Sequence, residues 1–241
     1  GHLSKRIKNL KKDLKIRAKL GRVEISKRFF KTGPGEYGEG DIFWGVTVPE
    51  CRIVAKLYRD LSLNEIREIL SSPVHELRFT ALVILVAQYR SNPSKVYRTY
   101  ISNRRWVNNW DLVDVTAPQI VGSYLWDSKD FSLLYQFAKS RNLWTRRIAI
   151  VSTLTFIRQG SFQHTVKIAK ILLHDNHDLI HKAVGWMLRE IGKRDLKVLY
   201  RFLDQHAHQM PRVMLRYAIE RCPESKRKNY LQSSKIVRSD I

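Results

Sequence analysis

An internal repeat constrains the fold of this chain more than any other feature. A basic residue followed by small and aliphatic residues recurs at Arg78, Arg147, Lys182 and Arg216. The intervals between these residues are 69, 35 and 34 positions, and 69 is two periods of about 34.5. A period of this length with two helices per repeat is typical of an α-solenoid. We therefore predict an all-α chain in which stacked helix pairs form a curved solenoid.

The rest of the sequence fits this prediction. Pro49 suits a first helical turn, and Ser62 with Glu65 forms a capping box before an apolar run. We find no convincing pair of strands. The degenerate pattern favours HEAT-like repeats, and we expect the solenoid to curve around a basic concave face. A missing copy of the repeat should fall near residue 113, where an acid replaces the basic residue. Further helices are expected over 73–89, 93–101, 109–126, 129–140, 143–158, 161–174, 178–193, 195–206 and 210–221.

The N-terminal segment 1–32 is strongly basic, with twelve Lys and Arg against Asp13 and Glu24. The apolar positions 3, 7, 10 and 14 recur at helical spacing, so we predict basic N-terminal helices here. Their charged face is either solvated or in contact with phosphates. The Gly-rich stretch 33–48 should form a structured turn that presents Phe43, Trp44 and Val46 to the body of the domain. Its acidity and its surroundings argue against a dinucleotide site.

Composition limits the class of partner. Lys and Arg number 44 and Asp and Glu 22, giving a formal charge of +22, which makes a polyanion the default partner. The longest apolar run, Ala81 to Ala87, is too short to span a membrane. Two cysteines without ligand spacing favour a reducing compartment. We expect a single HEAT-like domain over 1–241 that is monomeric and located in a bacterial-type cytoplasm or nucleoid.

Several segments resemble the AlkD-type DNA alkylation repair glycosylases, a HEAT-like family. W-D-L-V-D at 110–114 resembles the family's W-D-x-V-D segment, and W-T-R-R-I-A-I at 144–150 resembles its W-x-x-R-x-A-I helix. K-A-V-G-W-M-L-R-E at 182–190 is similar to its K-A-I-G-W-x-L-R-E helix, and 29–41 is similar to the opening of many members. The similarity spans about residues 25 to 221.

The resemblance implies that duplex DNA with alkylated bases is the partner and that no cofactor or metal is needed. In the family, residues equivalent to Trp110, Asp114, Arg147 and Trp186 form the concave site that holds the lesion-bearing backbone. Trp110 and Trp186 would pack on the deoxyribose, Asp114 would lie beside the anomeric carbon, and Arg147 would contact a phosphate. Asn109 stands where the family often has a second tryptophan, which leaves substrate preference open. The other expected DNA contacts are Lys27, Arg28, Lys31, Arg146, Lys182 and Arg189.

These residue types suit the implied chemistry. A purine alkylated at N3 or N7 is cationic and already a good leaving group, so a general acid is dispensable. Breaking its glycosidic bond builds positive charge on the sugar, which a carboxylate such as Asp114 stabilises. Indole faces attract that developing charge. The resemblance further implies that the base need not be flipped into a pocket, in contrast to most glycosylases.

Other interpretations remain open from the sequence. Both tryptophans could be core residues, and Asp114 and Arg147 could form structural ion pairs. Asp111 would be a cap or a partner of the site rather than the catalytic carboxylate. His174, His177 and His181 lie close together, but a loop with Asp175 or Asp178 as helix cap explains them better than zinc. The last fifteen or so residues look frayed, and this basic tail (222–241) would contact DNA or only solubilise the chain. A non-catalytic nucleic-acid-binding solenoid is the alternative function, and a protein-interaction scaffold is a third.

Overall fold

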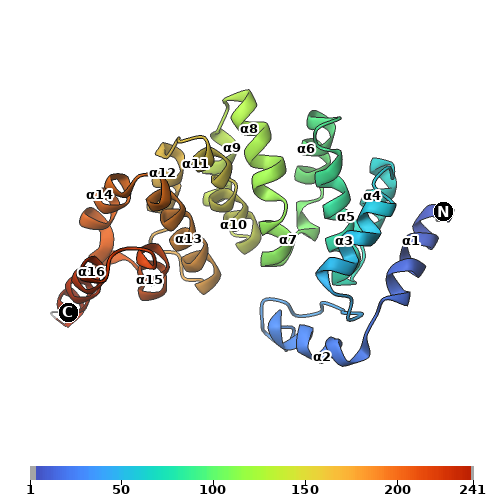
Figure 1. Cartoon of the computed structure of the whole chain (residues 1–241), viewed down its shortest axis with the longest axis horizontal. Helices are drawn as coiled ribbons and strands as arrows, with labels where there is room; N and C mark the ends of the chain where they lie inside the picture. Colours follow the sequence, from blue (N-terminus) through green and yellow to red (C-terminus); the bar gives the residue numbers. More distant parts are fainter. Residues whose placement is uncertain (1–3, 240–241) are drawn as a thin grey trace. The chain divides into compact units, whose positions relative to one another are not determined.

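The structure is a computed structural model that describes residues 4–239. Helices account for nearly all regular structure in this range, as Figure 1 shows. The one β-type contact among these residues is an isolated parallel bridge between Ile42 and Val74. The predicted all-α class is therefore confirmed. The chain divides into two compact units, Gly1–Tyr124 and Leu125–Ile241, and the boundary falls within helix α8 (Ser123–Ser128).

The described part of unit 1 contains seven α-helices before α8, a 3-10 helix between α6 and α7, and a π-helix between α7 and α8. Its elements are α1 (Lys5–Ile16), α2 (Leu20–Phe29), α3 (Val48–Leu57), α4 (Leu63–Leu70), α5 (His75–Gln88), α6 (Pro93–Ser102), the 3-10 helix η1 (Arg104–Trp106), α7 (Trp110–Asp114) and the π-helix η2 (Ala117–Gly122).

Helix α1 confirms the predicted amphipathic stripe. Ser4 caps the helix by accepting a hydrogen bond from the backbone N–H of Ile7, at 3.1 Å. Ile7, Leu10 and Leu14 are fully buried, and α1 packs on α3 through this stripe. The first member of the predicted stripe, Leu3, lies outside the described residues. The basic residues of α1 therefore lie on its remaining, solvent-facing surface.

Helix α5 forms the centre of unit 1. Its apolar residues between 77 and 85 are almost all buried, and it packs against α3 and α4 on successive faces. The capping box predicted at Ser62 is present and starts α4, with the backbone N–H of Glu65 3.1 Å from the Ser62 hydroxyl. The segment 33–46 between α2 and α3 contains no helix longer than a turn. Phe43 and Val46 are buried and Trp44 is half-buried, as the turn was predicted to present them.

The helix predicted over 109–126 is interrupted. Helix α7 ends at Asp114, and a π-helical segment begins at Ala117 before α8. Pro118 lies in the first turn of the π-helix, and its missing N–H cannot continue an α-helical hydrogen-bond ladder from α7. Thr116 instead satisfies the end of α7 by donating its hydroxyl to the Leu112 carbonyl at 2.6 Å. The break keeps α7 short, so that Asp114 is its last residue.

Unit 2 is also helical, and α13 (Asp178–Arg194) is its longest fully described helix. The other elements are α9 (Ser132–Ala138), α10 (Leu143–Val151), α11 (Leu154–Arg158), α12 (Gln163–Ile171), α14 (Leu196–His206), the 3-10 helix η3 (Ala207–Gln209), α15 (Arg212–Ile219) and α16 (Glu224–Ser239). Helix α13 packs against α10, α14 and, most extensively, α15. A single helix thus organises the unit.

Two expectations for unit 2 are corrected. The helix predicted over 143–158 is two helices, because Ser152 and Thr153 donate their hydroxyls to carbonyls of the preceding turn, each at 2.6 Å. The N-cap of α13 is His177, whose Nδ1 accepts from the Leu179 N–H, and neither Asp175 nor Asp178 takes that role. The C-terminal segment expected to be frayed is helical up to Ser239, and residues 240–241 lie outside the described residues.

Helix α16 is held by a specific contact of its middle turn. Tyr230 is buried and donates its hydroxyl to the Asp204 carboxylate of α14 at 2.7 Å. Arg212 of α15 donates to the Leu231 carbonyl at 2.9 Å. These two contacts anchor α16 at Tyr230 and Leu231.

The basic residues of the repeat do not share one environment. Arg78 and Arg147 are buried, Lys182 is half-buried, and Arg216 is exposed. The small residues of the motif are the more constant part, since Ala81, Ala149, Ala183 and Ala218 are all buried. The repeat therefore reflects helix packing, in which small residues permit close approach. Its basic residues do not form a row of equivalent charges.

Helices α13 and α15 approach each other closely at Gly185 of α13. A Cβ at this position would lie 2.5 Å from Cβ of Tyr217 and 2.6 Å from the Met214 carbonyl oxygen, both on α15. Both neighbours are rigidly placed, because one is backbone and the other is the first side-chain atom. The glycine is therefore required by the packing of α13 on α15.

We predict that Gly185→Ala lowers the free energy of unfolding by about 1–3 kcal/mol through overpacking. Urea unfolding followed by circular dichroism measures the change. Gly21→Ala is the matched control, because nothing lies within 4 Å of a Cβ at Gly21 in α2. That control should be neutral or stabilising by roughly 0.5–1 kcal/mol. Equal behaviour of the two variants would contradict the packing argument.

Candidate nucleic-acid site

Helix α7 carries two of the predicted site residues. Asn109 caps it, accepting a hydrogen bond from the Trp110 N–H at 2.8 Å. The Trp110 indole is half-buried and packs on Phe30 in a stacked arrangement and on Phe29 edge-on, with ring centroids 5.5 Å apart in both pairs. Phe29 and Phe30 end helix α2, so α2 and α7 meet through these rings. Trp110 is thereby fixed in orientation while part of its surface stays open.

Asp114 is half-buried at the end of α7, one turn after Trp110. Burial raises the pKa of the Tyr100 phenol. The hydrogen bond with Thr116 lowers this pKa, and the nearby negative charge of Asp114 raises it. Tyr100 is fully buried and lies 2.7 Å from the Thr116 hydroxyl. Asp114 therefore stands at the edge of an apolar interior, where a carboxylate acts on a positive charge more strongly than in bulk water.

A buried chain of ionisable groups holds the other acid of α7. His75 of α5 lies between Asp111 and Asp41, with Nε2 2.6 Å from an Asp111 oxygen and Nδ1 2.6 Å from an Asp41 oxygen. Arg78 donates to the second oxygen of Asp41 at 3.0 Å and to the Ser72 carbonyl at 3.2 Å. This Asp111–His75–Asp41–Arg78 network ties α7, α5 and the Gly-rich loop together. Asp111 thus links α7 to α5 through His75, and the N-cap of α7 is Asn109 rather than Asp111.

The network determines the charge of His75. Burial by itself lowers the pKa of this histidine, but the charges of Asp111 and Asp41 and their hydrogen bonds outweigh burial and raise the pKa to about 9. Both ring nitrogens face carboxylate oxygens. Only the doubly protonated ring can donate a hydrogen bond to both of them. Phe30 and Phe43 flank the ring at centroid distances of 4.5 and 4.7 Å. At neutral pH the centre of unit 1 therefore contains an imidazolium.

Glu76, the next residue, fixes the loop that precedes α3. Its buried carboxylate accepts hydrogen bonds from the backbone N–H groups of Trp44, Gly45 and Val46 at 2.8–3.1 Å. Three backbone donors on one carboxylate make this segment rigid. The Trp44 side chain consequently leaves the loop from a fixed point.

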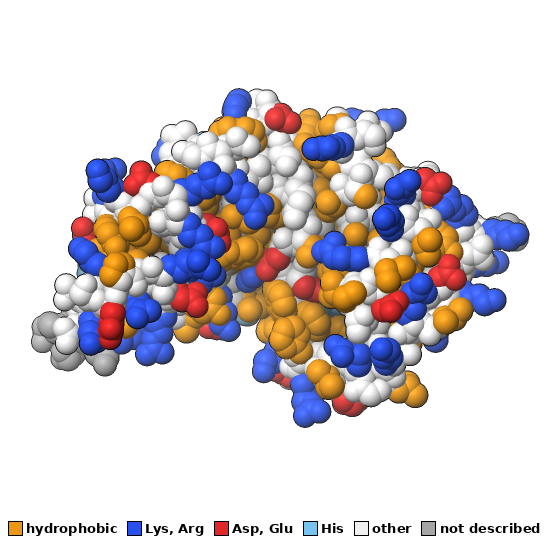
Figure 2. Space-filling model, viewed as in Figure 1, with side chains coloured by type: hydrophobic (Ala, Val, Ile, Leu, Met, Phe, Trp, Pro, Cys, Tyr) orange, Lys and Arg blue, Asp and Glu red, His pale blue; other side chains and the backbone are white. Residues whose placement is uncertain are grey.

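Three predicted DNA-contact residues lie at or near the end of α2. Lys27, Arg28 and Lys31 are exposed, and among the described residues no carboxylate lies within ion-pair distance of Arg28 or Lys31. Lys27 has only Glu24, at 3.5 Å. Figure 2 shows an apolar patch on the visible face beside α2, with Lys and Arg around it. Phe29 contributes exposed apolar surface on α2, since 60 % of it is accessible.

In unit 2, α10 supplies two adjacent arginines with different roles. Arg146 is bound on several sides, with Nε 2.7 Å from the Asp175 carboxylate and Nη1 in reach of the Ser140 and Arg141 carbonyls. Arg147 is only 5 % exposed, and its Nη1 donates to the Leu179 carbonyl at 2.6 Å. Arg147 thereby connects α10 to the start of α13.

The remaining predicted residues lie on α13. Trp186 is half-buried, and its Nε1–H donates to Glu190 at 3.3 Å. Lys182 pairs with Asp178 at 3.0 Å, and Arg189 pairs with Glu220, the C-cap of α15, while its guanidinium lies over the Tyr217 ring. These cations are partly neutralised in the free protein. The structure thus brings Trp110 and Asp114 together on α7, and Arg147 and Trp186 onto neighbouring helices of unit 2.

The histidine group of unit 2 has structural roles. Nδ1 of His177 caps α13, and burial lowers the pKa of this histidine. His181 is hydrogen-bonded through Nε2 to the Asp175 carbonyl. Within residues 4–239, no group of three or more His, Cys, Asp or Glu side chains has the geometry of a metal site.

The sequence did not reveal the roles of His75, Asp41 and Glu76. A usable signal existed, because His75, Glu76 and Arg78 stand in the first turn of the helix with the longest apolar run. Ionisable groups entering a core must find partners. Asp41, in the Gly-rich loop, gave no comparable sign.

We predict that the His75 network makes unit 1 more stable at neutral than at alkaline pH. Because the folded-state pKa of about 9 exceeds the unfolded value near 6.5, the stabilisation is complete below about pH 6.5 and is lost as the pH rises through 9. The full effect is on the order of 3 kcal/mol. Unfolding free energies from pH 6 to 10 test this for wild type, His75→Gln and the exposed control His208→Gln. A wild-type profile no steeper than that of His75→Gln would contradict it, and NMR titration of the His75 ring gives the pKa directly.

Comparison with known proteins identifies the family. The sequence model described as DNA alkylation repair enzyme matches residues 10–222, most of the chain. No curated protein matches significantly. Among solved structures, a predicted DNA alkylation repair enzyme from Enterococcus faecalis is similar in fold, with a TM-score of 0.69 and 15 % identity over 86 % of this chain and 98 % of that one. None of the described helices combines the length and apolarity that crossing a membrane requires. The chain belongs to the DNA alkylation repair enzyme family.

Proposed function

We propose that this protein is a DNA glycosylase that hydrolyses the N-glycosidic bond of cationic N3- or N7-alkylated purines in duplex DNA. Water adds to the anomeric carbon as the bond to the purine nitrogen breaks. The bonding electrons stay with the purine, which leaves as a neutral base, and the water proton passes to solvent. The product is an abasic site. No cofactor or metal enters this reaction.

The observation that supports this most strongly is the placement of Asp114 in a chain of this family. Its carboxylate ends a short helix, is half-buried at the margin of an apolar interior, and follows the open face of Trp110 by one turn. A fixed carboxylate beside the anomeric carbon stabilises the positive charge of the transition state and orients the attacking water. The leaving base carries its own positive charge, so the mechanism needs no proton donor.

Trp110 and Trp186 are assigned to packing against the deoxyribose. Each is half-buried and held by neighbours, Trp110 by the rings of Phe29 and Phe30 and Trp186 by Glu190. A fixed indole excludes water and attracts developing positive charge without reorganising. Recognition through the sugar and backbone leaves the base stacked, so the proposal includes no base-flipping pocket.

Binding is assigned to cations on a curved array of HEAT-like repeats with a basic concave face. Arg28 and Lys31 are the best placed, because they are exposed and have no carboxylate within ion-pair distance among the described residues. Lys27, Lys182 and Arg189 would exchange weak protein partners for phosphates. Arg146 and Arg147 are already bound, so we assign them to holding α10 and α13 as well as to DNA.

We predict that Asp114→Asn lowers the rate of 7-methylguanine release from methylated duplex by about 100-fold or more, because the shape stays and the charge is lost. Single-turnover rates and the unfolding free energy should be measured together. Asp127→Asn removes an exposed carboxylate and serves as the matched control. If Asp114→Asn released 7-methylguanine as fast as wild type, this carboxylate would have no part in the chemistry. Tight DNA binding with no release by wild type would favour the non-catalytic nucleic-acid-binding solenoid.

We further predict that affinity for undamaged duplex falls steeply with salt and depends on α2. Arg28→Gln and Lys31→Gln should each reduce the slope of log K against log salt by about 0.9, the value for one lost phosphate contact. Lys56→Gln, an exposed lysine of α3, provides the control with equal loss of charge. A shallow salt dependence for wild type would instead favour a protein-interaction scaffold.

A further inference from the structure

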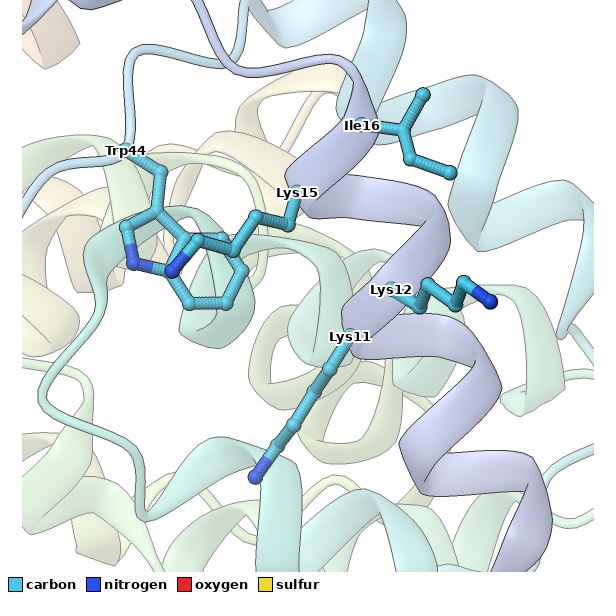
Figure 3. Close-up of a pocket in the computed structure, with 5 residues that line it drawn as sticks. All are labelled: Lys11, Lys12, Lys15, Ile16 and Trp44. Carbon is cyan, nitrogen blue, oxygen red and sulfur yellow. The ribbon is translucent and has the colours of Figure 1, made fainter.

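A basic hollow with an aromatic wall lies on unit 1 and is lined by residues outside α7. It is shallow, encloses about 420 Å³, and is lined by Lys11, Lys12, Lys15 and Ile16 of α1 and by Trp44 of the loop before α3. The Lys15 ammonium lies 4.8 Å from the centroid of the indole. Figure 3 shows Lys11 and Lys15 extending on the side of α1 nearer to Trp44, whereas Lys12 and Ile16 project from the other side. The Lys15 ammonium thus lies over the indole, and Lys11, one helical turn earlier, extends from the same side of α1 (Figure 3).

The backbone that carries the Trp44 indole is held in place. Glu76 binds the backbone N–H of Trp44 and of the two following residues, as described above. Gly45 has a φ of +82°, and its carbonyl accepts a hydrogen bond from the Lys19 N–H at 3.0 Å. A Cβ at Gly45 would collide with the Lys19 carbonyl oxygen. The loop is therefore held between α5 and the start of α2, so the backbone at Trp44 needs no ordering to receive a ligand.

The lysines of the hollow keep their full charge. Among the described residues, no carboxylate lies within ion-pair distance of Lys11, Lys12 or Lys15. Asp13 of α1 accepts from the Tyr58 hydroxyl, and Glu50 of α3 pairs with Arg17 at 2.8 Å. An unneutralised cluster beside an aromatic face is suited to an anion that carries a planar ring.

We propose that this hollow binds an unpaired nucleotide of a single-stranded nucleic acid. The base stacks on the Trp44 indole, and Lys11 and Lys15 contact the flanking phosphates. A lysine on a flexible four-carbon stem can leave the ring face and follow a phosphate, whereas the backbone that carries the indole stays fixed. Stacking requires an exposed base face, and in a duplex both faces of an internal base are covered by its neighbours. The site therefore discriminates in favour of single strands.

This inference goes beyond the proposed glycosylase activity. Its ligand is an undamaged single strand and its residues are not those assigned to base release. The test below uses no lesion, so its failure would leave the glycosylase proposal standing. Conversely, failure of the Asp114→Asn experiment would leave the single-strand site untouched.

The test measures binding of fluorescein-labelled dT12 by anisotropy as a function of salt. The variants are Trp44→Ala, Trp44→Phe and the double variant Lys11→Gln/Lys15→Gln. The matched control is Lys5→Gln/Lys8→Gln, which removes the same charge from exposed positions of the same helix outside the hollow. A dT12 strand with 5-iodouracil, irradiated on the full-length wild-type protein, reports the stacked residue by mass spectrometry of the cross-linked peptide. Thermal unfolding checks that each variant folds.

We expect Trp44→Ala to weaken dT12 binding roughly tenfold and Trp44→Phe to retain most of the affinity, because one stacked base is lost only in the first. Lys11→Gln/Lys15→Gln should reduce the salt slope by about 1.4, that is 0.7 per single-strand phosphate, and the control should not. The cross-link should fall on Trp44. Equal loss in both lysine pairs, a cross-link elsewhere, or equal displacement of dT12 by polyglutamate would overturn the proposal. If Trp44→Ala unfolds, the cross-link and the lysine variants still decide it.

Discussion

The imidazolium of His75 is the interaction on which the arrangement of unit 1 depends. It joins Asp41 of the Gly-rich loop to Asp111 of α7 inside an apolar setting, and Arg78 completes the neutralisation of Asp41. Removing one member would leave an uncompensated buried charge, which is costly. Because α7 is only five residues long, its own hydrogen bonds cannot hold it rigidly. The position of Trp110 and Asp114 is therefore set by this network and by the rings of Phe29 and Phe30.

The neighbouring Glu76 constrains a second part of the Gly-rich loop. Two consecutive acid–base residues of α5 face different parts of one loop, so that His75 fixes Asp41 and Glu76 fixes the backbone from Trp44 to Val46. The loop that the sequence marks by its glycines is consequently one of the most constrained segments of the unit. Unit 2 is constrained differently, by the close contact of α13 with α15 at Gly185 and by the Arg147 link from α10 to α13.

The sequence predicted the helical class, the capping box at Ser62 and the buried stripe of α1, because these depend on local spacing and on short-range hydrogen bonds. It did not predict the break after α7, since the effect of Pro118 competes with a helical pattern on both sides. It misplaced the cap of α13, because histidine is an uncommon cap beside two aspartates. The polar composition of α16 concealed the anchoring of Tyr230 on Asp204, which is a long-range contact.

The candidate site was predicted in the same uneven way. Family resemblance pointed to Trp110, Asp114, Arg147 and Trp186, and the family itself is confirmed, whereas the roles of these residues stay predictions. The network around His75 needs residues 34 and 36 positions away, which no local pattern reveals. Similarly, the exposed lysines of α1 gave no sign of the indole beside them until the loop was placed.

The central claim is that the protein cleaves the bond between an alkylated purine and its sugar by hydrolysis. Mass spectrometry of all products from a duplex with a single 7-methylguanine, under single-turnover conditions, tests it most directly. The account predicts free 7-methylguanine in an amount equal to the lesion lost, a strand that breaks only after alkali, and an unchanged protein mass. A protein heavier by one methyl group with guanine left in the strand, or a lesion that persists in the bound duplex, would contradict it.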